Sequence, residues 1–233
     1  MYDPLEVDLS FKLIKKLKQT LTQKWGLMGG WAVFFHVSKE YHLAFGKEYL
    51  KSRDIDICIF SKDSFLDKIS EIGFRKSAYS FRYEMIYDRE KSKFISEREA
   101  KNKHIFNLIY IFLDVFSPKK IEGVNSWVIK DLSQAKIENI DNFPVIDVNS
   151  LLKSKVLSFF EREKIDKEMK DACDIFALLF YSKRKIKKTR EIREAVNKIL
   201  TREDLTRFIA ENVLGDSIKE PLVIAKLKNY LKP

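Results

Sequence analysis

Two aspartates, Asp54 and Asp56, stand two residues apart in the run DIDICIF, which spans residues 54–60. The run is rich in isoleucine and is bounded by charged residues, so it predicts a β-strand. Side chains at alternate strand positions share one face, and the strand rise places these two carboxylates ~6–7 Å apart. Two carboxylates at that spacing repel each other unless a cation lies between them. The alternative is an exposed strand edge whose acids are solvated.

A third aspartate, Asp114, follows the apolar run IYIFL at residues 109–113. The strand predicted there, over residues 104–116, is long and buried. If it neighbours the DIDICIF strand, three carboxylates come together and can hold two magnesium ions ~3.5–4 Å apart. Such a pair of ions stabilises the attacking and leaving oxygens of a phosphoryl transfer. The alternative is that Asp114 simply marks the end of a strand.

Gly29 and Gly30 precede the apolar stretch WAVFFHV. Glycine lets the backbone approach a ligand closely, and the N-terminus of a following helix presents free N–H groups to phosphate. This pair therefore predicts a phosphate-binding turn, although a glycine pair alone also fits a plain turn.

A second polar cluster lies on two predicted helices near the middle of the chain. Lys155 and Arg162 are seven residues apart, so they share a helix face after two turns. Asp171 and Asp174 are three apart on the next predicted helix and are also neighbours. The pattern fits either a binding site or a surface ion-pair cluster between two helices.

The elements that must position these residues change in type along the chain. An amphipathic helix is predicted from Leu9 to Leu21, followed by strands at 27–28, 54–60, 80–87, 104–116 and 127–129. The lysine-rich stretch 89–103 is predicted to be a mobile loop. After Pro144 the pattern is helical, with helices predicted over residues 151–163, 169–181, 192–200, 204–213 and 221–231. We therefore expect an α/β domain over residues 1–144, with a mixed sheet and flanking helices, and a C-terminal helical domain over residues 145–233.

The sequence resembles the DNA polymerase β-type nucleotidyltransferase superfamily at three places taken together: Gly29-Gly30, the acid pair at 54–57 and Leu113-Asp114-Val115. Its pattern is a Gly-Gly or Gly-Ser turn, an acid-x-acid strand and a third acid on a later strand. The resemblance implies a nucleotidyltransferase core that moves an NMP from an NTP to an acceptor and releases pyrophosphate. It also implies that Asp54 and Asp56 bind two Mg²⁺ ions, and that Asp114 binds the catalytic one and helps to deprotonate the acceptor.

The strings LMGGWAVFFHV and SRDIDICIF are most similar to the AbiEii-like branch, which is known from bacterial and archaeal toxin–antitoxin systems. Lys155, Arg162 and the run KDACDI at 170–175 resemble the Lys…Arg…(Lys/Arg)-Asp-x-x-Asp-(Leu/Ile) helices of that branch. The resemblance implies that Lys155, with Arg162 and the glycine turn, contacts the triphosphate, and that Asp171 orders Lys155 or the acceptor. Members often carry Arg-x-Thr before the acid pair, where this chain has Ser52-Arg53, so the role of Arg53 stays open.

The net charge of +10 raises the odds of an acidic partner. Residues 183–233 contain 14 basic and 7 acidic residues, and this basic tail fits either a solvated face or a nucleic-acid contact. The leading expectation is an enzyme that adds NMP to RNA, with tRNA as the leading case, and with an antitoxin protein as a further partner. The alternatives are nucleotidylation of a protein or small molecule, and a non-catalytic binding module. The role of Arg82, on the strand predicted over 80–87, also stays open.

Two cysteines, Cys58 and Cys173, are too few for a disulfide framework and are predicted to be small core residues. The N-terminus has no signal-peptide pattern, and the most apolar stretch, 105–113, is too short to span a bilayer. We therefore expect a soluble, cytoplasmic protein with no membrane partner.

Overall fold

A computed structural model of the chain describes residues 3–61, 64–79, 81–117, 127–128 and 135–232. The chain forms two compact units. Met1–Ala32 and Lys51–Ile146 make up the first, which we call the sheet unit, and Val33–Leu50 and Asp147–Pro233 make up the second, the helical unit. The predicted domain boundary after residue 144 stays a prediction.

The sheet unit contains one mixed sheet, which has nine strands in the described part of the chain. The order along the sheet is β3-β4-β6-β2-β1-β9-β8, with β5 beside β4 and β7 beside β6. Strands β2 and β6 run parallel, whereas β4 pairs with β6 in the antiparallel sense. The strands are β1 (Trp25–Met28), β2 (Ile55–Ile59), β3 (Arg75–Lys76), β4 (Arg82–Asp88), β5 (Lys93–Ile95), β6 (Leu108–Ser117), β7 (Trp127–Val128), β8 (Ile137–Ile140) and β9 (Phe143–Ile146).

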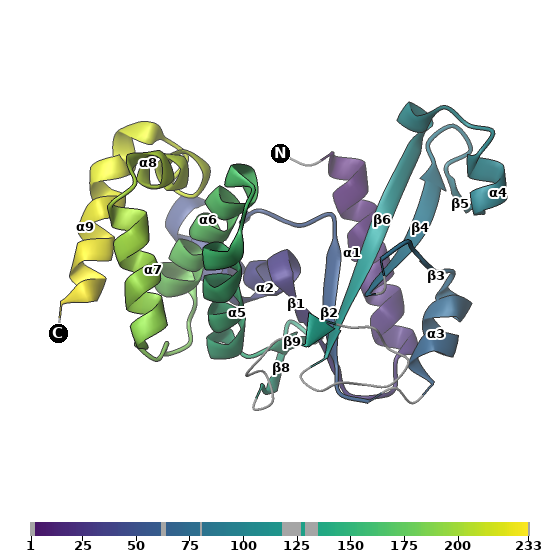
Figure 1. Cartoon of the computed structure of the whole chain (residues 1–233), viewed down its shortest axis with the longest axis horizontal. Helices are drawn as coiled ribbons and strands as arrows, with labels where there is room; N and C mark the ends of the chain where they lie inside the picture. Colours follow the sequence, from purple (N-terminus) through teal and green to yellow (C-terminus); the bar gives the residue numbers. More distant parts are fainter. Residues whose placement is uncertain (1–2, 62–63, 80, 118–126, 129–134, 233) are drawn as a thin grey trace. The chain divides into compact units, whose positions relative to one another are not determined.

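The two faces of the long strand β6 differ in burial. Ile109, Ile111 and Leu113 alternate along it and are at most 1% exposed, whereas Tyr110 and Phe112 on the other face are half-buried. Helix α1 (Pro4–Thr20), labelled in Figure 1, contacts both β6 and α3 (Phe65–Ile72), and its Leu9, Leu13 and Leu17 are buried. Asp114 is on the same face of β6 as Tyr110 and Phe112, so the site lies on the less buried face of this strand.

The helical unit is built from α5 (Val148–Glu161), α6 (Ile165–Tyr181), α7 (Arg190–Leu200), α8 (Glu203–Asn212) and α9 (Glu220–Leu231), together with the second part of α2 (Gly29–Phe45). Helix α6 is its centre, because it contacts both α5 and α8 and buries a continuous stretch from Asp171 to Leu178. Tyr41 joins α2 to this core by donating a hydrogen bond to the carbonyl oxygen of Val213 at 2.7 Å. The short helix η3 (Ser217–Lys219) leads into α9.

The predicted architecture, a mixed sheet with flanking helices followed by a C-terminal helical region, is confirmed. The strand predicted over 54–60 and the five C-terminal helices form within about four residues of their predicted bounds. The first helix begins at Pro4, five residues before its predicted start, and Asp54 lies just before its strand. Both cysteines are free and buried, as predicted. Of the strand predicted over 127–129, Trp127–Val128 forms β7, and Ile129 lies outside the described residues.

Two predictions about local structure were wrong. The stretch 89–103 is not a plain loop: it contains β5 and the short helix α4 (Glu97–Ala100), which begins with a capping box between Ser96 and Glu99. The stretch before the C-terminal helices holds a hairpin, β8–β9, that the sequence analysis missed. Its two turn residues, Asp141 and Asn142, have φ of 49° and 65°. The helix η1 (Ile105–Asn107) replaces the first part of the strand predicted over 104–116.

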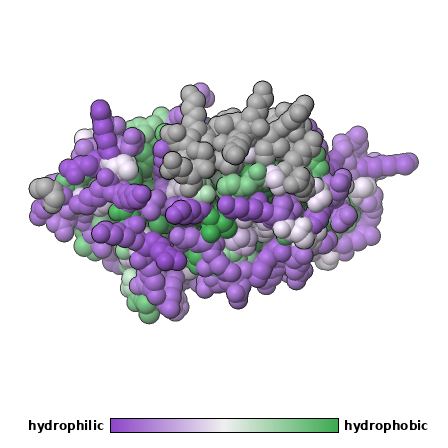
Figure 2. Space-filling model, turned by 90° about the horizontal axis from the view of Figure 1, so that it is seen from below, coloured by the Kyte–Doolittle hydropathy of each residue, from purple (hydrophilic) through white to green (hydrophobic). Residues whose placement is uncertain are grey.

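Among the residues described, no helix combines the length and apolar character needed to cross a bilayer. Figure 2 shows that hydrophilic residues cover most of the face seen from below, with apolar residues in small areas between them.

Candidate active site

Two of the three predicted acids lie side by side in the sheet unit. Asp56 is in β2 and Asp114 is in β6, and the two residues are directly opposite each other in the parallel register of these strands. Neighbouring strands are ~4.8 Å apart, so the two carboxylates extend from adjacent backbone positions. The condition set by the sequence, that the two acid-bearing strands are neighbours, is therefore met.

The third acid, Asp54, immediately precedes β2 and is more exposed than Asp114. About a third of its side-chain surface (34%) is accessible to solvent, and Arg53 Nε lies 3.7 Å from its Oδ1. Arg53 also lies 3.6 Å from Glu6 of α1. Arg53, whose role the sequence left open, thus contacts the acid beside it.

Arg82, whose role the sequence left open, binds Asp114. It is opposite Asp114 in the antiparallel β4–β6 register, and its Nε and Nη2 each donate a hydrogen bond of 2.7 Å to a different oxygen of the Asp114 carboxylate. These hydrogen bonds raise the pKa of the Arg82 guanidinium above its usual value, and the negative charges of Asp54 and Asp56 raise it further. Arg82 therefore sits in the field of all three acids.

Gly29 begins α2 and lies against the Asp56 carboxylate. Its φ is +58°, in the left-handed region that favours glycine. A Cβ built on Gly29 would overlap Oδ2 of Asp56 and lie 2.6 Å from its Cγ and 2.9 Å from its Cβ. Only glycine fits there, because the carboxylate occupies the space of the missing side chain. The positive end of a helix dipole thus lies beside an acid of the cluster.

The chemistry of this cluster fits a cation, but the cluster is not arranged as a finished metal site. Carboxylate oxygens are the ligands that Mg²⁺ prefers. Within the described ranges of the chain, no three His, Cys, Asp or Glu side chains are grouped so that they could hold a metal ion. At Asp114, the Arg82 guanidinium already binds both oxygens of the carboxylate. A divalent cation bound by Asp114 would have to displace the Arg82 guanidinium.

The second predicted cluster forms in the helical unit and is internally paired. Lys155 Nζ lies 3.1 Å from Asp171 and 2.7 Å from Asp174, and Arg162 Nε donates a 2.8 Å hydrogen bond to Asp171. Tyr49 also donates a hydrogen bond to Asp174, at 3.1 Å. The predicted ordering of Lys155 by Asp171 fits this contact, while the roles of Lys155 and Arg162 toward a triphosphate stay predictions.

Burial makes this network strongly coupled. Desolvation alone lowers the pKa of the Lys155 ammonium, but the charges of Asp174 and Asp171 outweigh it and hold that pKa well above its usual value. Desolvation likewise raises the pKa of Asp171, and the charges of Lys155 and Arg162 outweigh it and hold that pKa below its usual value. Lys155 and Asp171 are therefore both charged at neutral pH in the folded protein.

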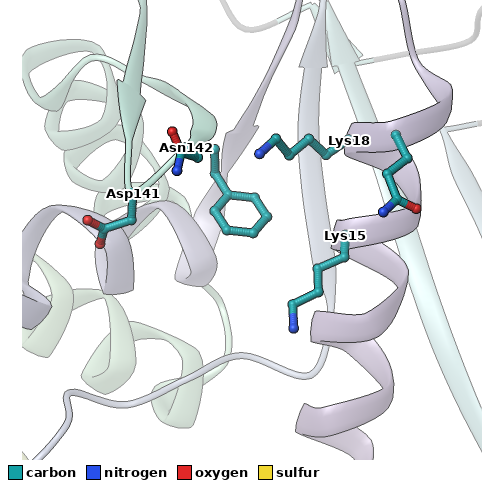
Figure 3. Close-up of a pocket in the computed structure, with 6 residues that line it drawn as sticks. Lys15, Lys18, Asp141 and Asn142 are labelled. Carbon is teal, nitrogen blue, oxygen red and sulfur yellow. The ribbon is translucent and has the colours of Figure 1, made fainter.

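We describe two cavities of the sheet unit. One, of about 510 Å³, lies between α1 and the β8–β9 turn; Figure 3 shows Lys15 and Lys18 reaching from α1 toward the side of Asp141 and Asn142. It contains none of the predicted site residues. The other, of about 410 Å³, is lined by Arg82 and residues near it, and so adjoins the acid cluster.

No protein-family model matches the chain, and no curated protein matches it either. Among solved structures, the chain is similar to an antigenic nucleotidyltransferase-like protein from Paracoccidioides brasiliensis, with 17% identity and a TM-score of 0.48. The similarity covers 91% of this chain and 97% of that one. A similarity of that size carries no inference about chemistry.

Proposed function

We propose that the chain is a metal-dependent nucleotidyltransferase that moves an NMP from an NTP to an acceptor. The observation that supports this most is the pairing of Asp56 with Asp114 on adjacent parallel strands, with Asp54 two residues before Asp56. The glycine that begins α2 lies against the same carboxylate. Two acids on adjacent strands beside a helix N-terminus suit a reaction on phosphate groups.

In the proposed mechanism, Asp54, Asp56 and Asp114 hold Mg²⁺. When bound, Mg²⁺ neutralises charge that develops on the phosphoryl group during transfer. The backbone N–H groups at the start of α2, from Gly29 and Gly30, bind and orient the phosphates. Asp114 accepts the proton of the acceptor hydroxyl while the oxygen of that hydroxyl forms a bond to the α-phosphorus. The bond from the α-phosphorus to the bridging oxygen breaks, and pyrophosphate leaves.

The acceptor we propose is RNA, with tRNA as the leading case. We also propose that the chain belongs to the AbiEii-like branch, which would give it a toxin role and an antitoxin protein as a partner. The basic segment 183–193 supports an RNA partner, because most of its lysines and arginines are exposed. Nucleotidylation of a protein or a small molecule is the alternative, and it predicts weak affinity for nucleic acid.

The direct test is incorporation of label. The protein is incubated with Mg²⁺, each α-labelled NTP in turn, and total RNA and protein extracts. The control is the double variant Asp54→Ala/Asp56→Ala. Label in RNA that is absent with the variant supports the proposal and gives the preferred NTP. Label in a protein band supports the alternative acceptor. Equal label with both proteins would refute the role of the acids.

A second candidate function is a nucleotide-binding module without turnover, and one observation favours it. The bidentate hold of Arg82 on Asp114 occupies both oxygens of the acid that the transfer mechanism needs. Mg²⁺-dependent NTP binding with no label transfer to any acceptor would support this candidate, and transfer at any level that depends on Asp114 would exclude it.

A further inference from the structure

The cavity beside the acid cluster has walls that suit a nucleotide. It has a volume of about 410 Å³, within the usual range for small-ligand sites. Its lining comes from β3, the residues 77–79 that follow it, β4, α4 and β6, which all belong to the sheet unit; these strands and the helix are labelled in Figure 1. The lining residues that matter for binding are Arg75, Lys76, Tyr79, Arg82, Glu84 and Phe112.

Flat side chains gather on one side of this cavity. The Arg82 guanidinium carbon lies 4.6 Å from the ring centroid of Phe112 and 5.6 Å from that of Tyr79. Tyr79 is 59% exposed, so its ring is accessible to a ligand in the cavity. Aromatic rings and guanidinium planes are the surfaces on which bases stack in single-stranded nucleic acids, whatever their sequence.

The same aromatic surface continues past the acid cluster. Phe112 and Phe116 are two residues before and two residues after Asp114 in β6, so all three side chains share one face of the sheet. Phe116 stacks on Phe81, with centroids 6.4 Å apart, and Phe81 in turn lies 6.0 Å from Tyr79. Rings therefore flank Asp114 along the strand in both directions.

The polar side of the cavity carries little unbalanced charge. Arg75 is paired with Glu84 and with Glu97, and Arg82 is paired with Asp114. Lys76 is exposed and, within the part of the chain that the structure describes, forms no ion pair. One cation is thus available, which matches the single charge of a phosphodiester better than the several charges of a triphosphate. The two glutamates can accept hydrogen bonds from ribose hydroxyls or base amino groups.

We propose that this cavity binds the terminal nucleotide of a single-stranded acceptor, with its base against Tyr79 and Phe112 and its phosphodiester at Lys76. Because Arg82 lines the cavity and also holds Asp114, a terminal hydroxyl there lies next to the acid that accepts its proton. This inference rests on the proposed function for the fate of that hydroxyl, but the binding of the strand is independent of turnover.

The test measures binding and transfer separately. Fluorescence anisotropy gives the affinity of a short labelled single-stranded RNA for the full chain, and a competition assay gives the affinity for Mg²⁺·NTP. The variants are Tyr79→Ala and Lys76→Gln. The matched control is Phe106→Ala, which removes another exposed ring of the sheet unit (80% exposed) that does not line the cavity. Melting temperatures confirm that each variant is folded.

Tyr79→Ala should weaken RNA binding about tenfold, the usual effect of removing one stacking ring, and leave NTP affinity unchanged. Lys76→Gln should weaken RNA binding and lower the slope of its salt dependence by about 0.7, as expected for one lost phosphate contact. Phe106→Ala should change neither affinity.

Unchanged RNA affinity in Tyr79→Ala, or a loss of NTP affinity in its place, would overturn the inference, as would a wild-type protein that does not bind single-stranded RNA. If Tyr79→Ala weakens RNA binding while the wild type transfers no label, the cavity is confirmed as a strand site and the proposed transferase function fails. The two failures are therefore distinguishable.

Discussion

Gly29→Ala is the substitution for which the structure gives the sharpest expectation. The new Cβ would overlap Oδ2 of Asp56 and lie 2.6 Å from its Cγ and 2.9 Å from its Cβ. The last of these atoms is fixed to the backbone of β2, so it cannot move aside by a change of rotamer. Relief requires a shift of the strand or of the start of α2, and either shift displaces the Asp56 carboxylate.

Two separate costs add up at this position. An alanine at φ +58° costs about 1–2 kcal/mol, as for any L-residue in the left-handed region. Forcing an extra carbon into a filled space typically costs another ~1–3 kcal/mol. The free energy of unfolding should therefore fall by about 2–5 kcal/mol. A carboxylate displaced by about 1 Å should also lower the rate of transfer on the order of 100-fold.

The chain contains a matched control for the first of these costs. Gly46 has φ +67°, and a Cβ built there meets no atom within 4 Å, so Gly46→Ala should cost only about 1–2 kcal/mol. Denaturant unfolding of both variants measures the difference. In an Asp56→Ala background the two closest contacts disappear, so Gly29→Ala should become less destabilising. Equal effects of Gly29→Ala and Gly46→Ala, with transfer unimpaired, would refute the close packing of Gly29 on Asp56.

Three further outcomes follow from the ion pairs and the basic segment. Lys155→Met should lower the free energy of unfolding at pH 7 by about 3–5 kcal/mol, because it removes the buried cation that pairs with both Asp171 and Asp174. The folded-state pKa of Asp171 is held below 3.8, so its pairing stabilises the fold above that pH and this stabilisation is lost as the pH falls. In urea unfolding, the difference in stability between the wild type and Lys155→Met should therefore shrink below pH ~4. A difference that does not depend on pH would contradict the pairing. Arg82→Gln should bind Mn²⁺ about tenfold more tightly than the wild type, as measured by calorimetry. The reason is that a charged hydrogen-bond donor, worth ~1.5 kcal/mol, no longer competes for the Asp114 carboxylate. Unchanged or weaker binding of Mn²⁺ would contradict that competition. In titrations at several salt concentrations, neutralising three lysines of the basic segment together should reduce the salt slope of RNA binding by about 2, and an unchanged slope would exclude this segment as the RNA contact. The three are Lys185, Lys187 and Lys188.

The strands that carry the acids were predictable because their signals are local. An isoleucine-rich run with acids two apart, and a long apolar run ending in Asp114, each specify a strand and the face on which its acids lie. Which strands become neighbours depends on long-range pairing, and a single sequence does not encode that pairing in any local pattern. The contact between Arg82 and Asp114 depends on the same register, so the sequence could place both residues on strands and still leave Arg82 without a partner.

Two elements were missed although a local signal existed. The β8–β9 hairpin turns at Asp141-Asn142, two residues that tolerate positive φ, but the flanking IENI and FPVI lack clean alternation and include a proline. The helix after β5 begins with Ser96 and Glu99, the spacing of a capping box, within a stretch whose many lysines suggested a loop. The need for glycine at position 29 could not be derived from the local sequence, because the atoms that exclude a side chain there belong to Asp56 of β2.

The central claim is that the three acids hold a divalent cation for chemistry on an NTP, and its most direct test needs no knowledge of the acceptor. Electron paramagnetic resonance measures binding of Mn²⁺ by the wild type and by Asp54→Asn/Asp56→Asn, each with and without a non-hydrolysable ATP analogue. The account predicts saturable Mn²⁺ binding that the analogue strengthens and that the double variant loses. Equal Mn²⁺ binding by both proteins, or no binding by the wild type with the analogue present, would contradict it.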